Sequence, residues 1–427
     1  MRRVVLSISS IVLVGLSALA CGGTSTTAVA GHEAGPGNLT FAVSDAFTGD
    51  QAFSGQVSGY PSKVACSMIN EAGGILGHQC QVDFIDTHSD TADALVALRQ
   101  EMVTATNLTL VIGVGTTDAP TLVPIIQKAN IPILSFSGSS AYIKSDNPYL
   151  WLLQPPDAQQ GAAMAAEAVA RGLKHAALLF TNSPDSLSVR DGALQAYQRL
   201  GGTVATEELI APDQASYGTE IEKVMGSNPD AILTELDPKT AGTFFGSLKN
   251  LHGINLPIIS DAVAAQPDWY TAVSHAIGRD LVSKWATALS SANPSTPGTD
   301  AFNKREHADF PNLGAPDTYS WSVYDGVTLA ALAMIDTKST NPVVFNSDIL
   351  KLATPSTGAV TVYDFASAKA ALAAGKKIYY EGANGGMFWN KYHSVDAPAA
   401  VTGFGLDGSQ NTISTISVAE IAAAMGV

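Results

Sequence analysis

Short apolar runs alternate with helical segments along most of this chain. The runs over residues 39–43, 81–85, 108–114 and 131–134 are separated by segments whose apolar residues recur every three or four positions. This pattern is typical of parallel strands covered by helices. After Pro155-Pro156 the same pattern restarts, with strands predicted at 176–180, 231–234 and 256–259. The pattern therefore predicts two successive α/β units.

The length of 427 residues also favours two units, because it exceeds the usual size of one hydrophobic core. We predict an α/β fold of two doubly wound parallel-sheet lobes joined by a hinge. Residues 38–157 plus about 281–395 are assigned to the N-terminal lobe, and 158–280 plus about 396–427 to the C-terminal lobe. The part after residue 281 is less regular, and a helix is expected over 322–335.

The first residues have the organisation of an export signal. Arg2 and Arg3 precede an uncharged apolar run, and Ser17-Ala18-Leu19-Ala20-Cys21 follows it, so residues 1–20 are predicted to be a signal peptide. Ala18-Leu19-Ala20 suits an ordinary signal peptidase, whereas Leu19-Ala20-Cys21 resembles a bacterial lipobox. The lipobox interpretation is favoured because the Gly-, Ser- and Thr-rich stretch that follows suits a flexible tether over 21–37. Lipidation at Cys21 would then anchor the protein to the membrane.

The charge of the chain argues against one class of partner. It carries 38 acidic and 23 basic residues, a net charge of -15, and no run of Lys and Arg longer than two. Nucleic-acid binding needs a basic face, so it is not expected. After the signal, no stretch approaches the ~18 to 20 apolar residues of a membrane span. We therefore predict a water-soluble, extracytoplasmic protein held at the membrane by lipid.

Two cysteines remain beyond Cys21. In an exported protein disulfides persist, so we predict a bridge between Cys66 and Cys80. The closed loop of about 15 residues would contribute ~3 kcal/mol on a chain-entropy estimate. The alternative is a metal site that adds His78 and His88, but this constellation is loose. No metal and no cofactor is predicted.

Candidate ligand-binding residues follow from a rule about open parallel sheets: ligands bind beyond the carboxyl ends of the strands. The loops in question are small and rich in hydroxyl groups or glycine in the first half, and partly acidic in the second. The same residue types are common in ordinary turns, Asp237 before Pro238 also suits a helix cap, and the aromatics Tyr142, Trp269 and Tyr270 suit packing as well as ligand contact. The six loops are Ala46-Phe47-Thr48-Gly49, Gly115-Thr116-Thr117-Asp118, Ser137-Gly138-Ser139-Ser140, Asn182-Ser183-Pro184-Asp185-Ser186, Glu235-Leu236-Asp237-Pro238 and Ser260-Asp261-Ala262.

Catalytic motifs are missing from the sequence. It has no Gly-x-Ser-x-Gly elbow, no phosphate loop ending in Gly-Lys-Ser/Thr and no His-Glu-x-x-His. Gly403-Phe404-Gly405-Leu406-Asp407-Gly408 has dinucleotide-motif spacing, but a strand pattern follows it where the motif needs a helix. We interpret it as a turn, and no enzymatic activity is expected.

Several segments resemble the type I periplasmic binding proteins, in particular the branched-chain amino acid group that serves ABC transporters. The resemblance extends over nearly the whole chain after the tether. The most specific segment contains "IN…GGI.G" and runs over 65–78; the others are Val111-Ile112-Gly113, Ala129 to Leu134, Tyr324-Asp325-Gly326-Val327 and Tyr380-Glu381-Gly382-Ala383.

The resemblance implies that two hinged lobes close on a ligand and present it to a membrane permease. By position, Thr116, Thr117, Ser137 and Ser139 match family residues that hold an amino acid's carboxylate, and Asp261 matches an acidic residue that receives its ammonium. Two departures stand out. Ser186 replaces a family tyrosine, and Asp237 falls near another aromatic position, so the ligand need not be a branched-chain amino acid. Cys66 and Cys80 look like the local bridge of some actinobacterial relatives.

Together these patterns predict an extracytoplasmic solute-binding lipoprotein of an ABC transporter, working as a monomer. Its ligand would be small and polar, such as an amino acid, an amide or an organic acid. The alternative is a ligand-sensing receptor subunit of the same fold. The predicted ligand-binding residues are Phe47, Thr116, Thr117, Ser137, Gly138, Ser139, Ser186, Asp237 and Asp261.

Overall fold

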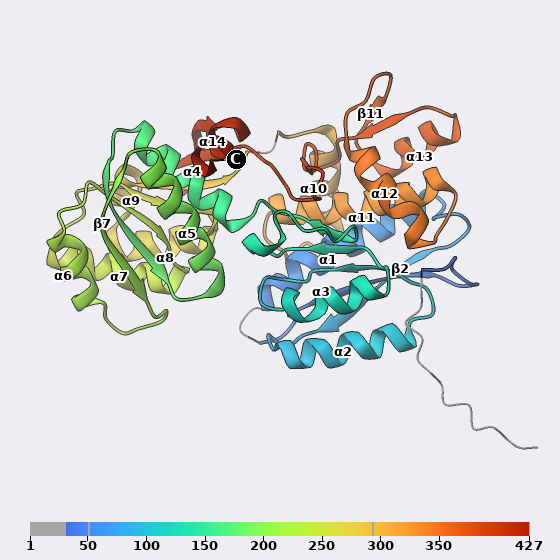
Figure 1. The fold of residues 1–427 in the computed structure, drawn as a ribbon, viewed down its shortest axis with the longest axis horizontal. Helices are drawn as coiled ribbons and strands as arrows, with labels where there is room; N and C mark the ends of the chain where they lie inside the picture. Colours follow the sequence, from blue (N-terminus) through green and yellow to red (C-terminus); the bar gives the residue numbers. More distant parts are fainter. Residues whose placement is uncertain (1–30, 50–51, 293, 427) are drawn as a thin grey trace, which may run out of the picture.

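Two α/β lobes lie side by side in the computed structural model, which describes residues 31–49, 52–292 and 294–426 (Figure 1). Each lobe has its own main sheet, and parallel pairing predominates in both. The predicted fold class is confirmed. The predicted signal peptide 1–20, the lipidation site Cys21 and tether residues 22–30 lie outside the described residues.

The first lobe is built on a parallel sheet whose strand order is β2-β1-β3-β4-β5. Residues of β1 alternate between the two faces: Phe41 and Val43 enter one apolar core and Ala42 the other. β1, β3, β4 and β5 are buried on both faces and are largely apolar, as expected for parallel strands between helices, whereas the edge strand β2 is partly exposed. The strands are β1 (Leu39–Asp45), β2 (Cys80–Asp86), β3 (Leu108–Ile112), β4 (Ile133–Ser135) and β5 (Leu150–Leu152).

Helices from two distant parts of the chain cover this sheet. Helices α2 and α3 contribute to one core, and α1 packs with α11 to α13 in the other. The bounds are α1 (Ala52–Glu71), α2 (Thr91–Thr104), α3 (Ala119–Lys128), the 3-10 turn η1 (Ser140–Tyr142), α10 (Pro297–Asp309), α11 (Thr318–Thr337), α12 (Pro342–Ala353) and α13 (Phe365–Ala373), with a small parallel pair β11 (Val360–Val362) and β12 (Ile378–Tyr380).

The second lobe has the strand order β14-β13-β10-β9-β8-β6-β7. Its strands are β6 (His175–Thr181), β7 (Thr203–Ile210), β8 (Ala231–Glu235), β9 (Ile258–Ser260), β10 (Ala286–Ser291), β13 (Ala399–Phe404) and β14 (Gln410–Ile416). Its helices are α4 (Asp157–Ala170), α5 (Pro184–Arg199), α6 (Gly218–Gly226), α7 (Pro238–Leu251), the 3-10 turn η2 (Ala262–Ala265), α8 (Pro267–Ile277), α9 (Arg279–Trp285) and α14 (Val418–Met425).

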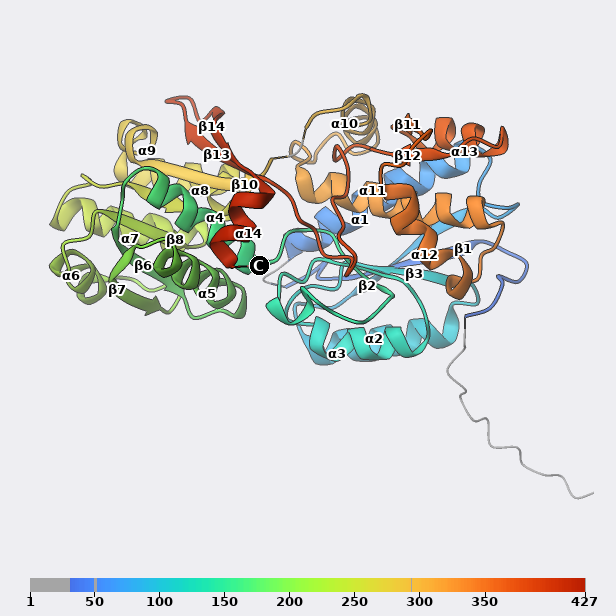
Figure 2. The same cartoon turned by 45° about the horizontal axis from the view of Figure 1, so that its top comes forward.

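Two details of this lobe differ from the sequence prediction. Strand β10 pairs with β9, so residues 286–291 belong to the second sheet and not to the first lobe, which we had expected to resume at about 281. The sheet also ends in an antiparallel hairpin, since β13 pairs antiparallel with both β10 and β14. Figure 2 shows β13 running from the connection between the lobes along β10. The predicted turn at 403–408 closes this hairpin, where Gly405 N–H donates to the Ser409 carbonyl over 2.7 Å.

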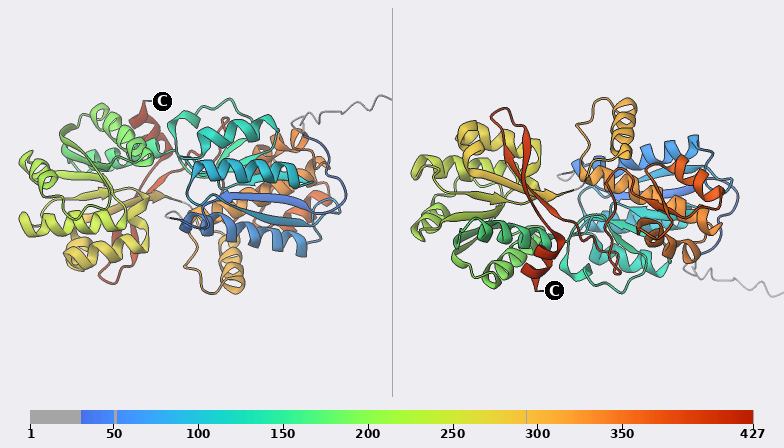
Figure 3. Two further views of the ribbon diagram at one scale, coloured as in Figure 1. Left: turned by 90° about the horizontal axis from the view of Figure 1, so that it is seen from below. Right: turned by 90° about the horizontal axis from the view of Figure 1, so that it is seen from above.

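The chain passes between the lobes in three segments: before α4, after β10, and before β13 (Figure 3). Two of these segments are bonded to each other, because Ala292 N–H donates to the carbonyl of Pro398 over 2.8 Å. The third segment carries Asp157, whose N–H donates to the Gly138 carbonyl over 2.9 Å. Adjacent connecting segments of this kind suit a hinge between rigid lobes.

Two segments named for the family resemblance meet in space within the first lobe. Asp325, on α11, is fully buried. Its carboxylate accepts hydrogen bonds from the Tyr380 hydroxyl at 2.8 Å, Ala383 N–H at 2.9 Å and Asn384 N–H at 2.7 Å. Gly382 has φ +63, and a Cβ there would lie 2.2 Å from the Asp325 carboxylate, so only glycine allows this close approach. The aspartate thereby fixes the 380–384 turn against α11.

The disulfide between Cys66 and Cys80 joins α1 to the start of β2. The two Cα atoms are 5.6 Å apart, and the residues are 14 positions apart in sequence. This separation of Cα atoms lies in the usual range for a bridge. Both cysteines are buried in the first lobe's core. The predicted pairing is thus present in the structure.

Replacing both cysteines with alanine is expected to lower the free energy of unfolding by ~3 kcal/mol, because the unfolded chain regains the entropy that the bridge removes. Chemical denaturation of the native and double-alanine chains measures the difference. Reduction with dithiothreitol serves as the matched control, since it opens the bridge without changing the sequence. A loss below about 0.5 kcal/mol in both experiments would contradict this prediction.

Within the described part of the chain, no helix combines the length and the apolar character that crossing a bilayer requires.

Candidate ligand-binding site

Two of the three predicted loops of the first lobe come together at the carboxyl ends of β3 and β4. The Thr116 hydroxyl accepts a hydrogen bond from Gly138 N–H over 3.1 Å, which joins the two loops directly. Ser137 N–H donates to the Ser135 hydroxyl over 3.0 Å, and Ser139 N–H donates to the Ser137 hydroxyl over 3.4 Å. Thr117 lies in the same loop with an exposed side chain. The loops over 115–118 and 137–140 are therefore one structural unit.

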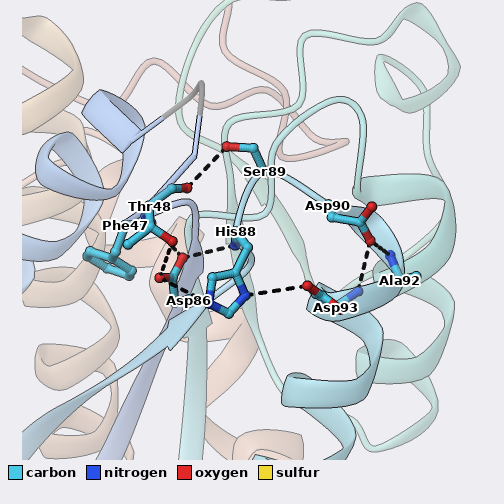
Figure 4. Close-up of polar contacts among 8 residues, drawn as sticks. All are labelled: Phe47, Thr48, Asp86, His88, Ser89, Asp90, Ala92 and Asp93. Atoms are coloured by element: carbon cyan, nitrogen blue, oxygen red, sulfur yellow. Dashed lines mark hydrogen bonds and ion pairs between the residues drawn. The ribbon is translucent and has the colours of Figure 1, made fainter.

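Phe47 lies in a separate arrangement at the ends of β1 and β2, drawn in Figure 4. Its ring stacks on Phe84 with centroids 4.3 Å apart, and its N–H donates to Asp86 over 3.0 Å. Asp86 also accepts from the Thr48 hydroxyl over 2.7 Å and from His88 N–H over 2.9 Å. These contacts account for Phe47 as a packing residue, and its role in ligand binding stays a prediction.

The predicted residues of the second lobe have distinct surroundings. Asp237 accepts hydrogen bonds from Lys239 N–H and Thr240 N–H, both over 3.0 Å, so it is the N-cap of α7. Ser186 is buried; its hydroxyl accepts from Thr181 N–H over 3.0 Å and lies against Glu235. Asp261, 3% exposed, caps η2 by accepting from Val263 N–H over 3.3 Å. Asp261 is one of four carboxyl groups that lie between the lobes, and Ser186 contacts another of them, Glu235. Asp237 caps its own helix.

Four carboxyl groups converge between the lobes: Asp157 at the start of α4, Asp185 in the first turn of α5, Glu235 at the end of β8 and Asp261 after β9. Burial, then the charges of Asp185 and Asp261, raise the pKa of Asp157 to about 8. Burial also raises the pKa of Asp261 to about 7, and burial together with the other three carboxylates holds the pKa of Glu235 well above its usual range. The four carboxyl groups are therefore close enough for their charges to interact.

One contact of this group crosses from lobe to lobe. The Thr116 hydroxyl of the first lobe lies close to the Asp185 carboxyl of the second. Burial raises the pKa of Asp185, and the nearby hydroxyl lowers it in part. Asp157 lies directly over the first lobe's serine-rich loop, since a Cβ on Gly138 would be 1.8 Å from an Asp157 oxygen. The loops that the strand-end rule selected in the two lobes thus meet at one place.

Tyr319, in the first turn of α11, completes this region. Its ring lies edge-on to Phe136 with centroids 6.0 Å apart. Burial raises the pKa of its hydroxyl, and the charges of Asp261, Asp317, Asp157 and Glu235 add to that rise. The hydroxyl is therefore near these carboxyl groups. Tyr319 also lines, with Gln154, Ser290 and Ala262, an open pocket beside the connecting segments.

Sequence reasoning did not single out Asp157, Asp185, Glu235 or Tyr319 as site residues. Asp185 and Glu235 lie inside loops that were selected, and the strand-end rule could have ranked them with Asp261. In sequence, Asp157 resembles an ordinary helix start. Tyr319 lies before the predicted helix 322–335, whose apolar residues indicated only packing. Among the described residues, no group of three or more His, Cys, Asp or Glu side chains is arranged to hold a metal ion.

With this geometry described, comparisons identify the class of protein. A sequence profile described as "Periplasmic binding protein" matches residues 38–404, and the chain belongs to that family. The predicted resemblance is confirmed, and the family is one of solute-binding proteins.

Solved structures share the fold at low sequence identity. The leucine binding protein LivK of Thermotoga maritima is 17% identical, with a TM-score of 0.69, over 89% of this chain and 99% of that one. LivJ of Streptococcus pneumoniae, in complex with isoleucine, is 19% identical with a TM-score of 0.69 over 89% and 99%. A solute binding protein of R. palustris in complex with benzoate is 14% identical with a TM-score of 0.67 over 89% and 96%. A comparison with curated protein sequences finds no match.

Proposed function

We propose that this chain is the extracytoplasmic solute-binding lipoprotein of an ABC transporter, and that it captures a small polar ligand between its two lobes by hinge closure. The observation that carries the proposal is the convergence of strand-end loops from both lobes, marked by the contact between Thr116 and Asp185. Closure that adds contacts from a second lobe stabilises the closed state by the free energy of those contacts.

The similar proteins support this role without fixing the ligand. Solved proteins of this fold bind leucine, isoleucine or benzoate, and several of them belong to ABC transporters. Here Thr116 and Ser137 lie in one unit while Asp261 lies across from it, so a ligand between the lobes would contact both. Presentation to a membrane permease is part of the proposal.

The proposed lipid anchor is consistent with how the chain enters the first lobe. Glu33 accepts hydrogen bonds from Thr340 N–H and the Thr340 hydroxyl, both over 2.8 Å, and from the Ser339 hydroxyl. The Ser339 bond is the largest cause that lowers the pKa of Glu33. The start of the described chain is therefore fixed to α12 and its preceding turn. An anchor at Cys21 would hold the first lobe and leave the second to move.

A thermal-shift screen tests the binding function. The chain purified without its first 21 residues is expected to melt at higher temperature with its ligand, because a compound that binds only the folded state adds about 2.7 kcal/mol at 100 times its Kd. The library should span amino acids, amides, amines, organic acids and sugars. Thr116→Val is expected to weaken any hit about tenfold, while Thr121→Val, at a partly buried position of α3, serves as the control. If no compound shifts the melting temperature, the proposal fails.

A further inference from the structure

The four carboxyl groups between the lobes have no cationic partner. Twelve ion pairs are present in the described part of the chain, and none involves Asp157, Asp185, Glu235 or Asp261. Asp157 is only 5% exposed, and its Oδ2 is buried without a hydrogen-bond partner. Glu235 Oε2 is likewise buried and unpartnered. A buried oxygen without a hydrogen-bond partner costs free energy, because it has lost its contacts with water. A ligand group that donates a hydrogen bond to it offsets part of that cost.

The first lobe's loops would by family position hold a ligand's carboxylate, but the N–H groups of Ser137, Gly138 and Ser139 already have partners. Gly138 N–H donates to the Thr116 hydroxyl, which lies close to the Asp185 carboxyl. Ser137 N–H and Ser139 N–H donate to neighbouring serine hydroxyls. The Asp157 carboxyl lies against Gly138 where a ligand's anion would need room. An incoming carboxylate would therefore find these N–H donors occupied and would depend on the side-chain hydroxyls. It would also face Asp157 and Asp185, which repel it when they are ionised.

Tyr319 supplies the other kind of surface that cations prefer. Its ring lies near Phe136, and its hydroxyl is near enough to Asp157, Glu235 and Asp261 for their charges to act on it. An ammonium among these carboxyls would therefore also lie near an aromatic side chain. Contacts between cations and aromatic rings gain strength where water is excluded. Four carboxyl groups beside an aromatic side chain thus favour an organic cation over a neutral or anionic solute.

We propose that the solute captured between the lobes is a small organic cation, with at least one ammonium or guanidinium group held by Asp157, Asp185, Glu235 and Asp261. This inference rests on the proposed solute-binding function and narrows its ligand. It excludes zwitterionic amino acids that depend on a carboxylate-binding loop, since that loop faces Asp157 here.

Calorimetry on the chain without its first 21 residues tests the proposal at about pH 8, where more of the carboxyl groups are ionised than at neutral pH. The cationic probes are putrescine, spermidine and agmatine; the comparison probes are leucine, benzoate, succinate and urea. At least one cationic probe is expected to bind at least 100-fold more tightly than any comparison probe. Asp157→Asn is expected to weaken that probe at least tenfold, while Asp280→Asn, which removes an exposed charge on α9, should leave its Kd within about twofold.

The outcomes separate the two proposals. Tight binding of leucine, benzoate, succinate or urea with no binding of the cations would overturn the cation assignment and leave the solute-binding function standing. An unchanged Kd in Asp157→Asn, with the variant's melting temperature at or above that of the native chain, would also overturn it. If neither set binds and the wider thermal-shift library is silent as well, the binding function itself fails, and the cation assignment fails with it.

Discussion

Raising the pH from about 5 to about 8 is expected to destabilise the ligand-free protein. The pKa of Asp157 is raised from 3.8 to about 8 and that of Asp261 from 3.8 to about 7, both mainly by burial. A carboxyl whose folded-state pKa exceeds its unfolded value stabilises the fold fully below the unfolded pKa, and this contribution is lost as the pH rises through the folded pKa. Each pKa unit corresponds to about 1.4 kcal/mol, so the loss is on the order of several kcal/mol.

Melting curves in matched buffers measure this effect, and a decrease of roughly 5 to 10 °C is expected. Other buried carboxyls also lower the stability as the pH rises, because burial raises the pKa of Asp45 to about 6 and those of Glu306 and Asp325 to about 7. The difference between native and Asp157→Asn chains isolates the cleft. The variant should lose less stability between the two pH values, and equal slopes in the two chains would refute the assignment of this effect to Asp157.

This behaviour also connects stability to ligand capture. Below about pH 6 the cleft can hold its own protons, while near pH 8 it carries charges that only an added cation neutralises. A bound organic cation should therefore restore most of the stability that the rise in pH removes. The same groups that weaken the empty protein are those that make binding favourable.

The parts of the fold that were predictable from sequence have long apolar runs. Strands β1 to β4, β6, β8 and β9 all overlap predicted runs, because strands buried on both faces need continuous apolar residues. Strand β10, with the sequence ATALSS, lacks large apolar residues and was assigned to the wrong lobe. Its place depends on pairing with β9 and β13, which is tertiary information that no local pattern carries.

The candidate site also has a part that the sequence predicts and a part that depends on tertiary structure. The strand-end rule selected the loops of Thr116, Ser137 and Asp261, and the structure brings these loops together. The importance of Asp157 was not predictable, because Pro155-Pro156-Asp157 has the pattern of any helix start. Its role follows from its position over Gly138. The predicted boundary put both residues in the first lobe, whereas the structure has Asp157 at the start of α4 in the second. Asp237 was weighed as a helix cap from the Asp-Pro pair, and the cap is what the structure shows.

Asp325→Ala is expected to lower the free energy of unfolding by about 3 to 5 kcal/mol, because it removes the one side chain that satisfies three buried donors. Those donors are the Tyr380 hydroxyl and the N–H groups of Ala383 and Asn384.

Urea denaturation of the native chain, Asp325→Ala and Asp325→Asn measures the effect. Asn keeps an oxygen for Tyr380 and Ala383 and loses only the acceptor for Asn384, so it should lose less than half as much stability as Ala. The Ala loss should appear in the first lobe, whose core contains Tyr380 and Ala383, and should leave the second lobe's transition unchanged. Equal losses in the two variants, or a loss below about 1 kcal/mol in Asp325→Ala, would show that the carboxylate does not hold the 380–384 turn against α11.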